Sequence, residues 1–377
     1  MNSKLLTKAI DDKTIVWFEA ANKYVVLENR AALILQDIAN DISVEKIAIE
    51  QSKQLNIPYE NVIELIRDLK QNLFDPNTKE KDVLKTNKEN ISVPNNFEFI
   101  KYYQINNITF KAAFQNEANL SFVHPKFAHL EVEKSLEVDF NYYVFTEESS
   151  TYFLVDNKII GSWNNENIHY FQGKFSMQIV QDIHRKSEDK WMGVFHASAV
   201  NDNKNAILFL GDSGSGKSTS LALLQANGFN CLADDFVPID TNKKEVYSFP
   251  SAISIKKNSL ETLLPLYPEL EHSAEYHFKS LNKIVRYLTP NNSDYSNHLP
   301  CKALVFIKYK KDSDLIISTI SKIEAFEKLV PDSWISPIEE NAQSFLDWFS
   351  NLPTYQLIYS DNNKMIEAVS KIFNDEL

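Results

Sequence analysis

The chain has 377 residues, of which 44% are hydrophobic and 24% charged, and this composition is typical of a globular protein with two or three domains. Its net charge of −12 argues against a nucleic acid as the main partner, because nucleic-acid backbones are bound by clusters of lysine and arginine. Two cysteines, Cys231 and Cys301, are too few for a disulfide scaffold and indicate a reducing cytoplasm. We find no signal-peptide pattern and no apolar stretch near the ~20 residues of a membrane span, so we expect a cytoplasmic protein without membrane contact.

Residues 1–75 predict a small winged-helix-like α+β domain. Two alternating apolar stretches, 14–18 and 23–28, predict a β-hairpin with a turn at 20–22. Three helices should follow: 30–38 with Asn29 as N-cap, 46–55 with Ser43 as N-cap, and 59–73, whose apolar residues have helical spacing.

Two segments separate this domain from the rest. Residues 76–96 are polar with prolines near both ends, which predicts a linker. Residues 97–190 are rich in aromatic residues and predict a β-rich domain, with strands at 97–100, 108–110, 151–155 and 158–161. Residues 191–377 have the pattern of an α/β domain.

The sequence from Gly211 to Ser218 (Gly-Asp-Ser-Gly-Ser-Gly-Lys-Ser) fits the Walker A pattern of a phosphate-binding loop. A buried strand is predicted before it at 205–210 and a helix after it at 217–226. Three of only seven glycines fall in this loop, where the backbone must curl around an anion. Lys217 would approach the β- and γ-phosphates of a nucleotide, and Ser218 would coordinate Mg²⁺. The residues expected to bind the nucleotide here are Gly211, Asp212, Ser213, Gly214, Ser215, Gly216, Lys217, Ser218 and Thr219.

Two adjacent carboxylates follow the next predicted strand. Residues 229–233 should form a strand that returns beside the loop and delivers Asp234 and Asp235 to the same crevice. One carboxylate can hold a metal while the other accepts a proton from an attacking hydroxyl. The alternative is an ordinary solvated acidic turn.

Two further residues are candidates for the same site. His196 lies in the segment 194–200, at the end of another predicted strand, where a histidine can also be purely structural. Arg286, one of only four arginines, could clamp a phosphoryl group or form a surface ion pair.

The order of His196, the loop from Gly211 and the pair Asp234-Asp235 resembles the catalytic core of HPr kinase/phosphorylase, and more distantly phosphoenolpyruvate carboxykinase. The resemblance is strong over 190–240 and loose over 241–377. It implies a P-loop kinase fold, an ATP- and Mg²⁺-dependent activity and a homo-oligomer. It also implies that Asp234 accepts the proton, that Asp235 joins Ser218 on Mg²⁺, and that His196 lines the phosphate site.

The downstream Glu-x-Arg-Gly-x-Gly signature of true HPr kinases is missing from the corresponding stretch, 247–254. The chain is therefore more similar to HPr-kinase-related kinases that act on other substrates.

The N-terminal segment is similar to PqqD-like domains over 27–35 and 43–48. Such domains bind the leader of ribosomally made peptides as an added strand on the hairpin edge. The two resemblances together imply a kinase for a hydroxyl, typically Ser or Thr, of a peptide or small protein recruited by residues 1–75. Two alternatives remain open: a kinase for an amino acid or a sugar, and a nucleotide-gated binding module without transfer chemistry.

Overall fold

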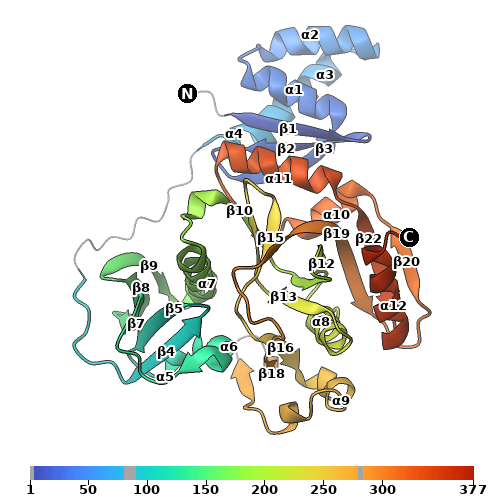
Figure 1. The fold of residues 1–377 in the computed structure, drawn as a ribbon. Coiled ribbons are helices and arrows are strands. Elements are labelled where there is room, and N and C mark those ends of the chain that lie inside the picture. The colour runs from blue at the N-terminus through green and yellow to red at the C-terminus, as the bar shows by residue number, and fades with distance from the viewer. Residues whose placement is uncertain (1–3, 80–90, 279–282) are drawn as a thin grey trace. The chain divides into compact units, whose positions relative to one another are not determined.

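The computed structural model describes residues 4–79, 91–278 and 283–377, and it is a mixed α/β protein (Figure 1). The chain divides into two compact units: residues 1–85 with 320–351, and residues 86–319 with 352–377. This division differs from the four predicted segments in two respects. Residues 320–351 group with the N-terminus, and the expected domains 97–190 and 191–377 share one unit. Most of the predicted linker 76–96 lies outside the described residues.

The first unit contains the predicted hairpin and a further strand. Strands β1 (Leu5–Ile10), β2 (Lys13–Phe18) and β3 (Lys23–Glu28) form an antiparallel sheet in the order β1-β2-β3. Helices α1 (Asn29–Ala39), α2 (Val44–Leu55) and α3 (Tyr59–Asp68) follow, and α3 continues into a π-helical turn, Leu69–Phe74, before α4 (Asp75–Asn77). The predicted strands and helices of this segment are thereby confirmed.

The predicted helix caps differ in outcome. Ser43 caps α2 as expected, since its side chain accepts a hydrogen bond from the backbone N–H of Lys46. Asn29 does not cap α1 but is its first residue, and its side chain accepts a hydrogen bond from Thr14 Oγ1 at 2.7 Å. The side chain of Asn29 therefore joins the helix to the hairpin.

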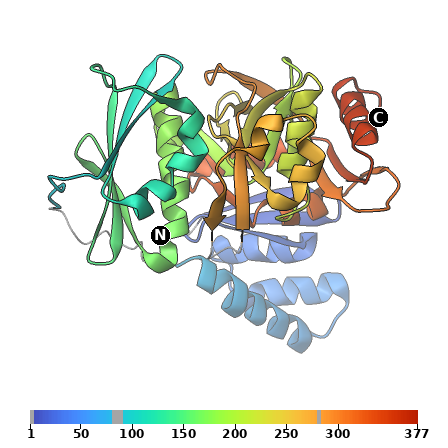
Figure 2. The same cartoon turned by 90° about the horizontal axis from the view of Figure 1, so that it is seen from below.

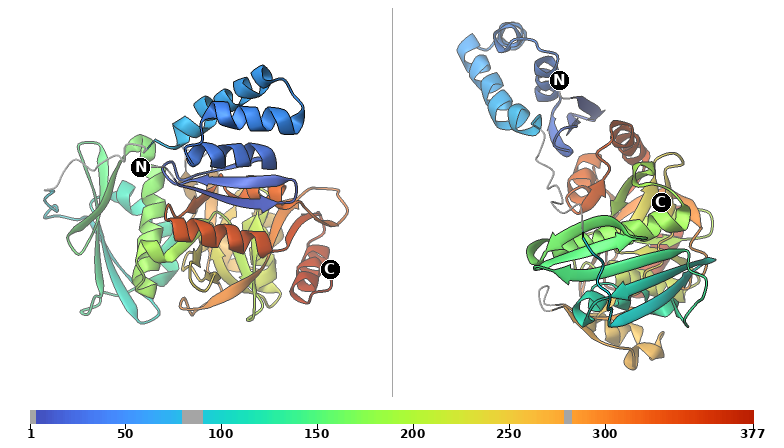
Figure 3. Two further views of the ribbon diagram at one scale, coloured as in Figure 1. Left: turned by 90° about the horizontal axis from the view of Figure 1, so that it is seen from above. Right: turned by 90° about the vertical axis from the view of Figure 1, so that its left-hand side faces the viewer.

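Both faces of this sheet are covered, and that explains why 320–351 belongs to the first unit. On one face Val16 and Phe18 pack into a core with α1, α2 and α3. The other face meets α10 (Lys322–Leu329) and α11 (Glu339–Asn351), where the Tyr24 ring lies 5.9 Å from that of Phe326 and 5.5 Å from that of Phe345. Figure 3 shows the sheet between the blue helices and the red-orange α11. The short strand β21 (Ser333–Ile335) links α10 to α11.

The second unit begins with a six-stranded sheet in the order β6-β4-β5-β7-β8-β9. Its strands are β4 (Phe99–Ile105), β5 (Ile108–Phe114), β6 (Glu131–Val132), β7 (Phe140–Glu147), β8 (Ser150–Val155) and β9 (Lys158–Asn164). The four predicted strands of this region are confirmed. β7 and the long helix α7 (Ile168–His184), which packs on β8 and β9 through Phe171 and Phe175, were not predicted (Figure 2).

The central sheet of the second unit carries the glycine-rich loop. Its strand order is β13-β11-β12-β19-β15-β14-β10, and β22 pairs with β19 and with β20. Its strands are β10 (Trp191–Phe195), β11 (Ser198–Asn201), β12 (Ala206–Leu210), β13 (Asn230–Asp234), β14 (Val237–Asp240), β15 (Glu245–Tyr247), β19 (His298–Tyr309), β20 (Ile316–Thr319) and β22 (Thr354–Tyr359). Helices α8 (Lys217–Ala226) and α12 (Asn362–Phe373) pack on it through a shared apolar core.

A small antiparallel sheet completes the second unit. It consists of β16 (Ile253–Lys256), β18 (Lys283–Leu288) and β17 (Tyr276–Phe278), and the short helix α9 (Leu260–Leu263) follows β16. Ile253 and Ile255 face the apolar core, so the alternate residues of β16 face the other way. Across the described residues of both units, no helix has the length and apolar character needed to span a membrane.

Candidate functional site

The loop between β12 and α8 has the backbone conformation that its glycines permit. Gly211, Gly214 and Gly216 have φ angles of 136°, 92° and 108°. A Cβ at Gly211 would come within 2.9 Å of the Ile307 carbonyl oxygen, so a larger residue would displace the loop from β19. The strand, loop and helix occupy the positions predicted from the sequence.

The loop rests on the carboxyl ends of three parallel strands. β12 is parallel to β19, and β19 is parallel to β22. The Tyr309 N–H at the end of β19 donates to the Ser215 carbonyl at 2.8 Å, and the Tyr359 hydroxyl at the end of β22 lies 2.7 Å from Ser220 Oγ. These contacts fix the amino-terminal end of α8, whose dipole favours a bound anion.

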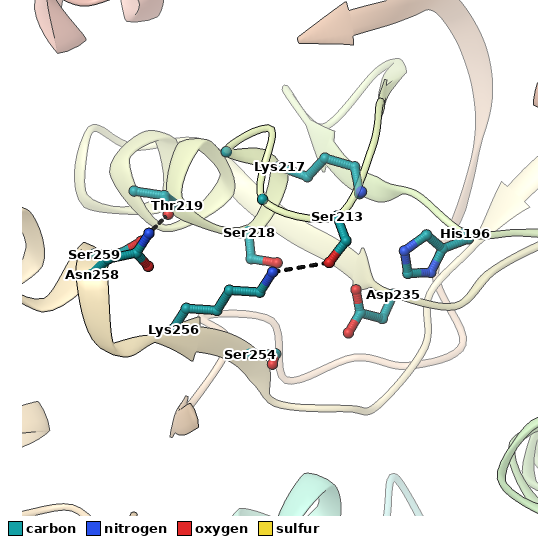
Figure 4. A pocket seen from close by; sticks show the side chains of 12 residues that line it. His196, Ser213, Lys217, Ser218, Thr219, Asp235, Ser254, Lys256, Asn258 and Ser259 are labelled. Atoms are coloured by element: carbon teal, nitrogen blue, oxygen red, sulfur yellow. Dashed lines mark hydrogen bonds between the residues drawn. The ribbon is translucent and has the colours of Figure 1, made fainter. Parts of the chain in front are cut away.

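Lys217 is held inside the loop. Its side chain is only 7% exposed, and its ammonium donates to the carbonyl oxygens of Gly211 at 2.6 Å and Asp212 at 3.4 Å. The charge therefore lies within the ring of backbone atoms that a phosphate would enter. Lys217 also lines a pocket together with Ser213, Gly214, Gly216, Ser218 and Thr219; we call this the loop pocket (Figure 4).

The strand order explains why the aspartate pair lies beside the loop. The returning strand β13 does not pair with β12. Instead, β11 runs between them, antiparallel to both. The start of β11 therefore meets the carboxyl ends of β12 and β13, and Ser198 is opposite both Phe209 and Asp234. His196 lies two residues before β11 and directly after β10, so it is carried to the same edge.

Asp234 lies beneath the loop pocket and is 2% exposed. Its Oδ1 accepts hydrogen bonds from Ser198 Oγ at 2.5 Å and Ser218 Oγ at 3.0 Å, and its Oδ2 accepts one from the Ser254 N–H at 3.0 Å. Burial, and secondly the charge of Asp235, raise the pKa of Asp234 to about 6. A metal at Ser218 would offset this cost, because it would favour the ionised carboxylate.

Asp235 is the carboxylate that reaches the pocket. Its φ angle of 61° turns the chain out of β13 in the left-handed conformation that aspartate tolerates better than most residues. Asp235 and His196 both line the loop pocket and lie at the same end of it (Figure 4). A hydrogen bond from Ala197 N–H to the Phe195 carbonyl at 2.9 Å closes a tight turn centred on His196, and this turn presents the imidazole.

These positions do not support the roles that the resemblance implied for the two aspartates. Both oxygens of Asp234 accept hydrogen bonds from protein groups, one of them from Ser218, and its side chain does not appear in the lining of the pocket. Asp234 is therefore suited to support a metal at Ser218, whereas Asp235 is suited to meet a reacting hydroxyl. Two neighbours in sequence face different surroundings because the chain reverses between them.

Lys256 is a site residue that sequence reasoning missed. Lys256 was not among the predicted site residues, yet it lines the loop pocket, where its ammonium donates to Ser213 Oγ at 3.0 Å (Figure 4). It lies 3.9 Å from the position that a Cβ would take at Gly214. The alternation of Ile253, Ser254, Ile255 and Lys256 placed Lys256 on the face of Ser254, but nothing in the sequence identified what that face meets.

Arg286 lies away from the loop pocket, which corrects the prediction of a phosphoryl clamp. It pairs with Ile255 across the β16–β18 ladder, and paired residues share a face, so it projects opposite to Ser254 and Lys256. Its guanidinium donates to the carbonyl oxygens of Leu270 and Glu271 and lies 3.5 Å from the Glu275 carboxylate. Arg286 therefore stabilises the segment that precedes β17.

The residues present fit a nucleotide with its magnesium ion. The glycine cradle, the amino end of α8, Lys217 and Lys256 offer positive potential to phosphates, and Ser218 with Asp234 and Asp235 offers oxygen ligands. The described residues contain no cluster of three or more His, Cys, Asp or Glu side chains suited to a metal. This accords with Mg²⁺ sites that use one or two carboxylates together with substrate phosphates.

Comparison with known proteins adds no assignment to this geometry. Neither the scan against protein-family models nor the search of curated proteins found a match for this chain.

Proposed function

We propose that this chain is an ATP- and Mg²⁺-dependent kinase with a P-loop kinase fold of the HPr-kinase-related type. The observation that carries the proposal is the loop pocket itself, in which a glycine cradle with a buried lysine meets a second lysine, a histidine and a carboxylate. A simple nucleotide-binding module needs the cradle but has no use for Asp235 and His196 at its open end. This weighs against a binding module without transfer chemistry.

The charged and polar residues that reach the phosphate end of the pocket have separate roles in the proposed reaction. Lys217 and the loop amides bind the β- and γ-phosphates, and Lys256 adds positive charge from the opposite wall. Ser218, supported by Asp234, holds Mg²⁺, which would neutralise charge on the phosphate oxygens. His196 lines the pocket beside Asp235, where it can orient the transferring group.

The proposed transfer balances without a further reactant. The acceptor hydroxyl oxygen forms a bond to the γ-phosphorus, and the bond from that phosphorus to the β–γ bridging oxygen breaks, so ADP leaves. Asp235 accepts the hydroxyl proton. Asp235 thus takes the place that the resemblance assigned to Asp234.

The first unit supports a peptide or small-protein acceptor. In the described residues β1 pairs along one edge of the predicted hairpin, while β3 pairs on one side only, with β2. An extended segment added along β3 would satisfy its outward N–H and C=O groups, as in other strand-addition complexes. Tethering of this kind raises the effective concentration of an acceptor that the pocket itself binds weakly.

The direct test is transfer from γ-labelled ATP to a panel of Ser- and Thr-containing peptides. We expect magnesium-dependent labelling by the wild-type chain and its loss in Asp235→Asn. If the wild type labels no acceptor, or if Asp235→Asn labels as fast as the wild type, the proposal is wrong. An ATP-dependent rise in melting temperature without any product would instead identify a nucleotide-binding module.

A further inference from the structure

A second cavity lies in the same unit as the loop pocket, between the small sheet and the segment that joins β5 to β6. Its volume is about 210 Å³, and it is lined by the turn at Pro125 to His129, by Ala252, by residues before and within β17, by Tyr287 of β18 and by Thr289 after β18. The Ala252 N–H donates to the Lys126 carbonyl at 2.9 Å, which holds that turn against the start of β16. We call this space the His129 cavity.

The His129 cavity and the loop pocket both adjoin β16. Ser254 and Lys256 share one face of β16 and line the loop pocket, whereas Ala252, which directly precedes the strand, lines the cavity. Tyr287 lines the cavity and is directly opposite Ser254 in the β16–β18 register. Burial, and secondly the charge of Asp235, raise the pKa of Tyr287.

His129 gives the cavity an unsatisfied polar group. Both of its ring nitrogens are buried, and no described residue provides either with a hydrogen-bond partner. Leaving such a group unsatisfied costs about 1 to 3 kcal/mol. Burial also lowers the pKa of His129 to about 4, so the ring is neutral near pH 7 and offers one donor and one acceptor. Neither nitrogen is reached by solvent in this conformation, so the ring would have to turn toward the cavity for a bound hydroxyl or amide to pair with one of them.

The remaining lining restricts the charge of a ligand. Among the described residues, the lining includes Ser273, Thr289 and the rings of Tyr276 and Tyr287, whose centroids are 5.5 Å apart, but no Asp, Glu, Lys or Arg. A carboxylate, an ammonium or a phosphate would lose part of its hydration here without gaining a partner of opposite charge from the described lining. The volume exceeds the roughly 150 Å³ of an engineered cavity that accepts benzene, so a ring or a side chain with its adjoining amide fits.

We propose that the His129 cavity is the acceptor pocket of this kinase, and that it takes an uncharged group with a hydroxyl or amide that hydrogen-bonds to His129. This inference rests on the proposed function. It favours a residue within a peptide chain over a free amino acid, whose zwitterionic backbone the cavity cannot pair. An uncharged sugar has the same chemistry and must be distinguished by experiment.

The test uses the full chain with isotope-labelled histidine and follows the His129 ring by NMR, assigned by its loss in His129→Phe. Three probes are titrated: N-acetyl-serine-N-methylamide, free serine and glucose. We expect the peptide-like probe to shift the His129 resonance saturably and free serine to leave it unchanged. A shift with glucose alone would contradict the proposal that the ligand is a residue within a peptide chain. An equal shift with free serine, or no shift of the His129 resonance with any probe, would overturn the proposal as a whole.

Two variants distinguish a cavity that binds a ligand from a packing defect that binds none. His129→Phe fills space and removes the hydrogen-bonding nitrogens, so it should lose the probe response, read by saturation transfer to the probe, while the melting temperature is unchanged or higher. His272→Phe, at an exposed histidine outside the lining, is the matched control and should bind as the wild type does. Thr289→Val removes one hydroxyl from the exposed rim of the His129 cavity, with little risk to folding.

The ATP-induced melting shift, measured on the same samples, keeps this proposal distinct from the kinase proposal. Probe binding with no transfer from ATP to any acceptor would refute the kinase and leave the cavity as a binding site. Conversely, transfer to a peptide with the same KM in His129→Phe and wild type would refute the cavity and leave the kinase.

Discussion

The loop pocket and the His129 cavity both adjoin β16, but their linings differ in charge. The loop pocket gathers Lys217, Lys256, Asp235 and His196 around a glycine cradle. The His129 cavity is lined by tyrosines, small residues and one neutral imidazole. A charged group is stabilised in the first and costly in the second. In the proposed reaction, the phosphates would bind in the charged pocket at one end of the strand and the uncharged acceptor would bind in the cavity at the other end.

Removing the central cation of the loop pocket should have the largest effect. In Lys217→Ala we expect transfer from ATP to fall by ~10²-fold or more, because preorganised charge at the transferring group is the main catalytic contribution. The measurement is the single-turnover rate with labelled ATP, with the melting temperature as the control for folding. If the single-turnover rate fell less than threefold, the buried ammonium would only stabilise the backbone of the loop and would not act on the phosphate.

The two aspartates should separate into different defects. Asp235→Asn should lower kcat by ~10²-fold or more while ATP still raises the melting temperature, because the proton acceptor is lost but the cradle remains. Asp234→Asn should instead raise the magnesium concentration needed for half-maximal rate, since Ser218 loses its supporting carboxylate. The opposite pattern would restore the assignment implied by the family resemblance.

Lys256, the last residue of β16, and Lys257, which follows it, provide a test variant and its matched control. Lys256→Ala should lower transfer by about tenfold, because its half-buried ammonium acts in a more water-like medium than that of Lys217. Lys257→Ala removes the same charge from an exposed side chain that does not line the pocket, and should leave the rate within twofold of the wild type. Equal losses in both variants would mean that net charge, and not position, is what matters.

The smallest effect should appear in the acid stability of the His129 cavity. The unfolded chain binds a proton at His129 near pH 6.5 and the folded chain only near pH 4, so the stability contributed by the neutral ring is lost as the pH falls through that window. His129→Phe should therefore lose less melting temperature between about pH 7 and pH 4.5 than the wild type does. His184, whose pKa burial also lowers to about 4, retains part of the slope in both proteins. If the melting temperatures of His129→Phe and the wild type changed equally with pH, the His129 ring would be more exposed to solvent than the structure shows.

The parts of the site that lie close together along the chain could be predicted from the sequence. The strand, loop and helix around Lys217 form one local unit, and glycines mark where its backbone must turn. The insertion of β11 between β12 and β13 could not be predicted, because pairing depends on partners distant in sequence. The roles of Asp234 and Asp235 depend on a single backbone reversal, which no side-chain pattern encodes.

The remaining differences come from cross-strand register. Arg286 and Tyr287 are neighbours, yet the pairing of β18 with β16 sends one toward the Leu270 carbonyl and the other toward the His129 cavity. The cavity itself collects residues from segments far apart, so composition and spacing carry no trace of it. The first unit differed for a similar reason, since residues 320–351 supply the second cover of a sheet made by the N-terminus.

This shared construction of the first unit has a consequence during biosynthesis. The sheet formed by β1, β2 and β3 emerges first from the ribosome, but the side chains that shield Tyr24, those of Phe326 and Phe345, are synthesised only near the end of translation. Until then one apolar surface of the nascent N-terminal sheet stays open to solvent or to a chaperone. The segment between them, which forms most of the second unit, has the time to fold first, and the first unit is completed last.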